Sequence, residues 1–217
     1  MQKTYIRTAS KEDFDQICRL GTRCLTEDPL LAYFGCTTTV GGVIDLLCTK
    51  SKETGEEEFA AVSVWLPPQK RLALWNVFVL LFSGIIALGE CIGTQGLWRL
   101  LWEFPAVVNE SWRAACYSLD DPASWSLCQT WYLKIAFTAP EHRNQGNMTS
   151  LVHHRLANGS GVSFTLDVPS KKLEQYFSQM NFEIMNRCRL GAGYVDEFGN
   201  PEQGGRGIEI VNMVKHH

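Results

Sequence analysis

The sequence predicts an α/β protein in which strands and helices alternate along a chain of 217 residues. In residues 131–137 the bulky apolar side chains stand at every second position, which is the period of a strand, and residues 148–156 follow with the apolar spacing of a helix. Residues 162–168 and 170–180 repeat this order of strand and helix. A chain of this length can bury a sizeable core, so we expect one domain over residues 1–217.

The N-terminal part is expected to begin with a strand at residues 4–8, followed by a helix. Ser10 is predicted to cap this helix, and Asp13 stands near its partially positive end. Asp28-Pro29 ends the helix. The apolar run 43–48 fits either another helix or a short strand.

Three further strands are predicted from their apolar character and from the residues that end them. Residues 59–66 form one strand, and Pro67-Pro68 stops it because proline cannot donate a ladder hydrogen bond. Residues 182–190 and 208–214 are expected to be the two closing strands of the chain.

A segment with few charges lies between these strands and the central strand. Residues 72–112 contain four tryptophans, and we expect two helices interrupted around residues 93–96. Residues 72–89 are a run of 18 without a charge, which is at the lower limit for a membrane span. Because strands on both sides are predicted to share one sheet, we expect no transmembrane span. A buried helix or one wall of an apolar substrate pocket is the better interpretation.

Charge and cysteine content exclude several classes of protein. The net charge is −3 and the basic residues are scattered, so we expect no nucleic-acid partner. None of the eight cysteines forms a Cys-x-x-Cys pair, and we expect no metal site. The first residues lack the apolar core of a signal peptide, which favours a cytoplasmic protein with reduced thiols.

The turn between the central strand and its helix is the segment most informative about function. It follows Pro140 and consists of Arg143, Asn144, Gln145, Gly146, Asn147 and Met148. Backbone N–H groups that point outward at a helix N-terminus form an anion site. We expect the anion to be a pyrophosphate.

This turn resembles the central motif of the GCN5-related N-acetyltransferase (GNAT) superfamily, where Arg/Gln-x-x-Gly-x-Gly/Ala follows a strand and begins a helix. Arg143, Gly146 and Met148 stand at the three marked positions, and the first two match. Residues 162–168 resemble the family's fifth strand and 170–180 its next helix. The resemblance implies a mixed, mostly antiparallel central sheet flanked by helices.

The end of that helix and the aromatic-rich insertion extend the resemblance. Asn181-Phe182 stands where the family has Gly-Phe, and the helical insertion 72–112 resembles a fungal-type branch that acts on small molecules. The family's usual acid is a tyrosine four residues before that glycine. Phe177 occupies this position, and Tyr176 lies next to it, about 100° around the helix.

For the site, the resemblance implies an acetyl-CoA cofactor. Residues 143–148 would bind its pyrophosphate, and the backbone of Ala136 and Phe137 would pair with its pantetheine arm. Asp167, on the strand that resembles the fifth, is a candidate base or a group that polarises the pocket. Tyr176 is the candidate acid.

Glu103 and Glu110 are further catalytic candidates, because both lie in the tryptophan-rich region, where an apolar pocket would favour a protonated carboxyl group. An exposed position on a helix is the simpler interpretation of both.

Three functional interpretations follow. The first is an acyl-CoA-dependent N- or O-acyltransferase that acts on a small, largely apolar molecule. The resemblance is compatible with a role in secondary metabolism and with a homodimer. The second is a GNAT-fold enzyme repurposed to a CoA-independent reaction, such as a cyclisation, elimination or decarboxylation. It is motivated by Met148 and Phe177, which differ from the family pattern. The third is a non-catalytic binding or scaffold protein, because fold alone does not determine function.

Overall fold

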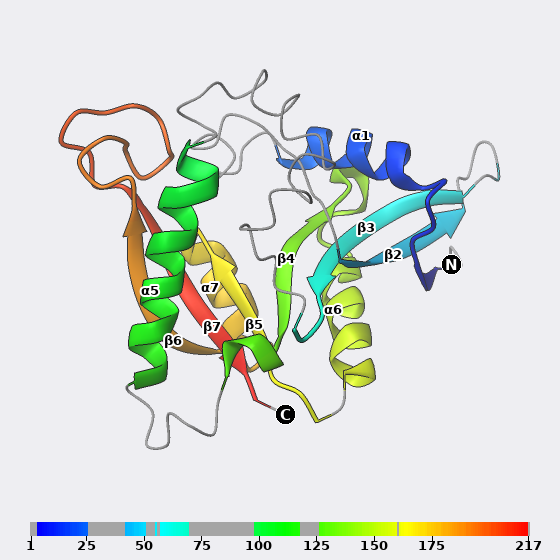
Figure 1. Ribbon diagram of the computed structural model, residues 1–217. Coiled ribbons are helices and arrows are strands. Elements are labelled where there is room, and N and C mark those ends of the chain that lie inside the picture. Colours follow the sequence, from blue (N-terminus) through cyan, green and yellow to red (C-terminus); the bar gives the residue numbers. More distant parts are fainter. Residues whose placement is uncertain are drawn as a thin grey trace.

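The computed structural model describes residues 4–25, 42–50, 55, 57–69, 98–117, 126–159 and 161–216. Within these residues the chain forms a seven-stranded sheet of order β1-β2-β3-β4-β5-β7-β6 (Figure 1). The strands are β1 (Tyr5–Thr8), β2 (Val43–Lys50), β3 (Glu57–Leu66), β4 (Trp131–Thr138), β5 (Phe164–Val168), β6 (Glu183–Leu190) and β7 (Ile208–Lys215). Every neighbouring pair is antiparallel except β4 and β5, which are parallel.

Helices cover both faces of this sheet. In the described part of the chain they are α1 (Phe14–Leu25), α5 (Phe104–Tyr117), α6 (Asn147–Asn158) and α7 (Lys171–Ser178). A short π-helix, η1 (Arg99–Glu103), precedes α5, and η2 (Leu127–Gln129) and η3 (Pro140–His142) are single 3-10 turns. Figure 1 shows α1 and α5 in front of the sheet and α6 and α7 behind it. We call these the α1/α5 face and the α6/α7 face.

The predicted mixed, mostly antiparallel α/β fold is confirmed. The run 43–48, which fitted a helix or a strand, lies within β2. Of the two helices expected over 72–112, the first and the interruption at 93–96 lie outside the described residues, as does the end of the N-terminal helix at Asp28-Pro29. The described part of the insertion comprises η1 and α5. Among the helices that the structure describes, none is long and apolar enough to cross a bilayer.

Successive side chains of β5 point to opposite faces of the sheet, one apolar and one polar. Phe164, Leu166 and Val168 belong to the core cluster packed beneath α6 and α7. Asp167 points to the opposite face, where it contacts α5 through Trp112. The strand therefore presents apolar residues to one side and a carboxylate to the other, as the period of two requires.

The start of α1 differs from the expectation. Ser10 was predicted to be the N-cap, but α1 begins at Phe14, and the Ser10 backbone N–H and hydroxyl both donate to the Asp13 carboxylate, at 2.7 and 3.0 Å. Arg7 donates to both oxygens of the same carboxylate, at 2.7 and 2.8 Å. The buried acid immediately before the helix thus organises this corner, and the serine is its donor.

Replacing Asp13 with asparagine is expected to lower the free energy of unfolding by about 2–3 kcal/mol at pH 7, because Arg7 would lose a largely buried partner. The Arg7 guanidinium holds the pKa of Asp13 far below its usual range. A depressed pKa stabilises the folded state above the unfolded value of about 4, and this contribution is lost as the pH falls further. Urea denaturation should therefore show that Asp13→Asn loses the same free energy of unfolding, relative to wild type, at pH 7 and pH 5, and loses less at pH 3.

The matched control is Asp15→Asn, at an exposed position in the first turn of α1. It should change stability by less than about 0.5 kcal/mol at all three pH values. A loss for Asp13→Asn that stays constant down to pH 3 would contradict the role assigned to the ion pair.

Candidate functional site

A gap opens in the middle of the sheet, between its two parallel strands. β4 and β5 pair over only three residue pairs, and the last of them joins Leu133 to Leu166. Beyond this pair the strands diverge, as Figure 1 shows. The remainder of β4, which includes Ala136 and Phe137, keeps its pairing with β3 on the other edge. Its edge toward β5 has no ladder partner within the described sheet, so extended backbone is available there to a ligand.

A β-bulge in β4 lies at the point where the strands part. The register with β3 shifts between Val64 and Trp65, which face Ile135 and Leu133, so Lys134 is the extra residue. Lys134 and Ile135 both face the α1/α5 side: the lysine ammonium lies 5.4 Å from the ring centroid of Phe104 on α5, and Ile135 packs in the core under α1. The bulge thus places two consecutive side chains of β4 on one face of the gap.

The turn that precedes α6 has an open, left-handed backbone. Asn144 has φ 59° and Gly146 has φ 74°, and Gly146 stands at the N-cap without a side-chain cap. No described residue accepts a hydrogen bond from the backbone N–H groups of residues 144–149. A Cβ built on Gly146 would meet nothing within 4 Å, so no described side chain fills the space beside this glycine. This is the geometry of an anion-binding turn at a helix N-terminus.

Side chains of the turn hold its shape by bonding backward to the chain. The Asn147 amide donates to the carbonyl of His142 at 2.9 Å, and the Gln145 amide donates to that of Glu141 at 3.1 Å. Arg143 donates to the carbonyl of Thr138 at 3.4 Å. These bonds engage side chains and carbonyl groups, and they leave the N–H groups free to bind an anion.

Met148 stands where the resemblance favours glycine or alanine. Its side chain is half-buried and packs against two core clusters, one beneath α6 and α7 and one that includes Leu47 and Leu151. The long side chain is therefore directed at the sheet rather than at the open side of the turn. Its departure from the pattern is compatible with an anion in front of the backbone.

On α7, the two aromatic residues have divided roles. Phe177 is buried in the core, with its ring 5.5 Å from that of Phe182. Tyr176 is half-buried, and its hydroxyl forms a 2.9 Å hydrogen bond with the hydroxyl of Thr149 in the first turn of α6. Burial raises the pKa of Tyr176, so the hydroxyl keeps its proton at neutral pH. The helix rotation between the two residues thus brings a hydroxyl group to the start of α6.

Asp167 lies on the other side of the gap and is held by three neutral donors. The indole of Trp112 and the amide of Asn212 donate to its Oδ1, at 2.8 and 2.6 Å. The Tyr132 hydroxyl donates to its Oδ2 at 2.8 Å. Since each carboxylate oxygen has two lone pairs, Oδ2 retains capacity to accept one more hydrogen bond.

The donors around Asp167 were not predicted. They come from α5, β4 and β7, and Asn212 is itself oriented by the hydroxyl of Ser111. One signal was present in the sequence, because Asn212 is an amide in the middle of an otherwise apolar stretch of the strand predicted at 208–214, and it is fully buried. A buried amide without a local partner requires a hydrogen bond from elsewhere in the fold.

The two remaining acidic candidates are placed apart from this network. Glu110 is on the exposed side of α5, where it pairs with Arg113 at 3.1 Å, and its side chain is 70% exposed. Glu103 is half-buried at the end of η1. The structure therefore brings the predicted turn, the β4 edge and Tyr176 together on the α6/α7 side of the gap, and it places Asp167 on the α1/α5 side.

Sequence comparison does not assign the chain, since no protein-family model and no curated protein matches it. Solved structures do share its fold. A mosquito arylalkylamine N-acetyltransferase-like 5b structure matches with a TM-score of 0.62 and 15% identity, over 99% of this chain and 100% of that one. A Drosophila melanogaster polyamine N-acetyltransferase matches with a TM-score of 0.59 and 12% identity, over 99% and 100%.

A third match is Arabidopsis thaliana NAA60 in complex with acetyl-CoA, with a TM-score of 0.56 and 10% identity, over 99% of this chain and 98% of that one. At these identities the likeness establishes the fold. The chain therefore has the fold of GNAT acetyltransferases, as the central segment predicted.

Proposed function

We propose that this chain is an acyltransferase that uses acyl-CoA, with acetyl-CoA as the first candidate. The acceptor would be the nitrogen or oxygen of a small, largely apolar molecule. One observation carries the proposal: the parallel pairing of β4 and β5 ends after three residue pairs, beside a left-handed turn whose N–H groups lack acceptors among the described residues. The likeness to an acetyltransferase solved with acetyl-CoA supports this choice of donor.

The residues present fit such a cofactor. The backbone N–H groups of 144–149 would hold the pyrophosphate, and the unpaired edge of β4 at Ala136 and Phe137 would hold the amides of the pantetheine arm. Acetyl-CoA supplies an activated acyl group when it is bound. The open space at Gly146 and the inward direction of Met148 leave room for the phosphates.

Two side chains are assigned to proton transfer in this proposal. Asp167 can accept a proton at Oδ2, and its three donors fix the carboxylate at the α1/α5 side of the gap. Tyr176 holds a proton at its hydroxyl, beside the first turn of α6. The two groups thus flank the gap from opposite faces, as an acid and a base acting on one reacting centre would.

We further propose that the protein belongs to a fungal-type branch that acts on small molecules, that it works in secondary metabolism and that it forms a homodimer. The CoA-independent alternative makes a separate prediction, because it requires that neither acetyl-CoA nor CoA binds.

A thermal-shift titration with acetyl-CoA tests the proposal. At one hundred times the dissociation constant, a ligand of the folded state adds about 2.7 kcal/mol of stability, which raises the Tm by several degrees. Free CoA should raise the Tm as well, because it carries the same pyrophosphate. Gly146→Asp should abolish both shifts, since it places a carboxylate in front of the N–H groups.

Gly161→Asp is the matched control. Gly161 also has a positive φ, of 78°, and open space at its Cβ, but it lies in the turn before β5. Both variants therefore incur the same backbone strain, and only Gly146→Asp should lose the ligand shift. If the wild-type protein shows no shift with either ligand, the acyltransferase proposal is wrong and a CoA-independent reaction becomes the better hypothesis.

A further inference from the structure

Exposed aromatic side chains occur at both ends of the helical segment formed by η1 and α5. Trp98 and Trp102 are 58% and 46% exposed, and Tyr117 at the far end of α5 is 74% exposed. The two indole rings stack on each other, with centroids 5.1 Å apart and an interplanar angle of 11°. Aromatic side chains of this size that remain exposed mark surfaces that bind a partner.

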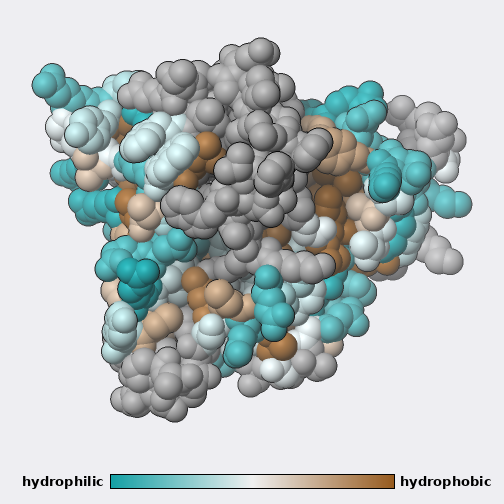
Figure 2. All heavy atoms as spheres, in the orientation of Figure 1, coloured by the Kyte–Doolittle hydropathy of each residue, from teal (hydrophilic) through white to brown (hydrophobic). Residues whose placement is uncertain are grey.

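The outer side of α5, which faces away from the sheet, carries these residues. The side that packs on the sheet consists of four buried residues, Val108, Ser111, Trp112 and Ala115. At 3.6 residues per turn, the opposite side consists of exposed residues, namely Trp102, Ala106, Asn109, Arg113 and Tyr117. We call these five residues and Trp98 the outer stripe of α5. In Figure 2, pale and hydrophobic side chains lie among hydrophilic ones on the left part of this face, where Figure 1 places α5.

The outer stripe has the composition of an interface rather than of a solvated helix face. Its large residues are tryptophan, tyrosine and arginine, the types most enriched at interface hot spots, and it contains no lysine. Ala106 near its centre is small enough to let another helix approach closely. Arg113 pairs with Glu110 at 3.1 Å, so its charge is balanced and its planar guanidinium can stack on an aromatic ring.

The order of residues along the stripe matches a second copy of the same helix. The steps between its successive members are four, four, three, four and four residues, so the spacing is the same from either end. In an antiparallel pair about a two-fold axis, Trp102 faces Arg113 of the partner subunit, which is a favourable cation–π pair. Trp98 faces Tyr117 of the partner subunit, and Ala106 lies next to the axis. Each contact occurs twice, as in every isologous interface.

The area of the stripe is sufficient for a stable dimer. A standard interface buries about 1,600 Å² in total, and an aromatic side chain contributes about 150–250 Å² when it is fully buried. The exposed parts of the three aromatic residues, counted on both copies, supply roughly half of the standard area. The stripe is about 28 Å long at 1.5 Å per residue, and the smaller residues along it add to this area.

We propose that two copies of this chain associate through the outer stripe of α5, antiparallel and about a two-fold axis between Ala106 and Asn109. The inference rests on the homodimer proposed above and assigns its interface. From its inner side, α5 supplies Trp112 to the Asp167 carboxylate. Pairing on the outer side therefore braces, in each copy, the helix that holds the proposed base.

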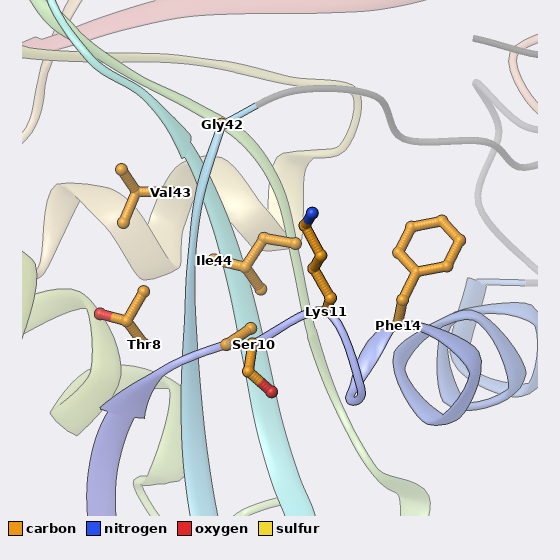
Figure 3. Close-up of a pocket in the computed structure, with 8 residues that line it drawn as sticks. Thr8, Ser10, Lys11, Phe14, Gly42, Val43 and Ile44 are labelled. Carbon is orange, nitrogen blue, oxygen red and sulfur yellow. The ribbon is translucent and has the colours of Figure 1, made fainter.

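Another exposed aromatic residue on the α1/α5 face provides a matched control. Phe14 is 51% exposed and lines a groove of about 500 Å³ between the start of α1 and the start of β2 (Figure 3). β2 lies near one edge of the sheet, whereas α5 packs on β6 at the other edge. A lysine in place of Phe14 thus adds the same charge at a similar exposure, away from the proposed interface.

Sedimentation velocity over a range of protein concentrations tests the interface. The wild type should sediment with twice the mass of one chain. Trp102→Lys should raise the dissociation constant of the dimer at least about tenfold, because it replaces an aromatic anchor with a cation that faces Arg113 of the partner subunit. Tyr117→Lys, at a still more exposed position, should do the same, and Phe14→Lys should stay within about twofold of wild type.

A monomeric wild type would overturn both the homodimer and its interface. A dimeric wild type whose dissociation constant is unchanged by Trp102→Lys and Tyr117→Lys would overturn the interface alone. The acyltransferase proposal is measured separately: acetyl-CoA should shift the Tm of these variants as it does that of wild type, because the turn at 143–148 precedes α6 on the opposite face of the sheet.

Cross-linking tests the antiparallel orientation. In a variant that carries both Trp98→Cys and Tyr117→Cys, the two new thiols of one chain are about 28 Å apart and cannot join each other. Treatment with oxidised glutathione should therefore link most of this variant into covalent dimers on a non-reducing gel. Tyr117→Cys alone, and the wild type with its native cysteines, should remain mostly single chains. An equal yield of covalent dimer from Tyr117→Cys alone would overturn the antiparallel arrangement.

Discussion

Replacing Asp45 with alanine is expected to lower the free energy of unfolding by about 3–5 kcal/mol, because it leaves a buried guanidinium without its counter-ion. Asp45 is on β2 and only 1% of its side chain is exposed. Arg155 on α6 donates to both oxygens of this carboxylate, with Nε at 2.8 Å from Oδ2. The same guanidinium lies 5.0 Å from the ring centroid of Trp131 on β4, so one side chain ties α6 to two strands.

Urea denaturation at pH 7 measures this loss, and Asp15→Ala on the exposed side of α1 is the matched control. A double variant, Asp45→Leu with Arg155→Met, should be more stable than the single Asp45→Ala variant, since it removes both buried charges together. The stabilising role of the Asp45–Arg155 pair would be wrong if Asp45→Ala lowered the free energy of unfolding by less than about 1 kcal/mol, or if the double variant were less stable than Asp45→Ala.

The secondary structure was largely predictable because local periodicity determines it. The spacing of apolar residues within a short stretch of sequence is enough to predict the strand and helix from Trp131 onward and the two closing strands. The run 43–48 was ambiguous for the same reason: a short apolar run looks alike in a buried strand and a buried helix. Its pairing with β1 and β3, which a local window does not contain, makes it a strand.

Contacts between elements were not predictable from spacing. The sequence predicted that Tyr176 and Phe177 face different directions on their helix. That the Tyr176 hydroxyl bonds Thr149 was not predictable, because this contact depends on how α6 and α7 pack together. The bulge at Lys134 is a matter of register with β3 and leaves no local signature in the sequence. The open turn around Gly146 was predictable, because glycine and asparagine mark left-handed backbone wherever they occur.

Replacing Asp167 with asparagine is expected to lower kcat for acyl transfer by about 10²–10⁴, the usual contribution of a positioned general base. The fold should tolerate this change. The Tyr132 hydroxyl now donates to Oδ2, and it can instead accept a hydrogen bond from the new amide, while Trp112 and Asn212 still donate to the retained oxygen. A loss of activity would therefore reflect the missing carboxylate rather than a disrupted network.

Thiol release from acetyl-CoA, measured with a panel of small amines and alcohols, gives the rate, and the thermal shift by acetyl-CoA gives the cofactor affinity. Asp167→Asn should reduce the first and leave the second unchanged, because Asp167 lies on the face of the sheet opposite the open turn. Glu110→Gln is the matched control: Glu110 is 70% exposed and pairs only with Arg113 among the described residues, so its rate should stay within about twofold of wild type. If Asp167→Asn retained full activity, the carboxylate would serve to join β4, β5, β7 and α5 on that face, and the base would have to be sought elsewhere, with the half-buried Glu103 as the next candidate.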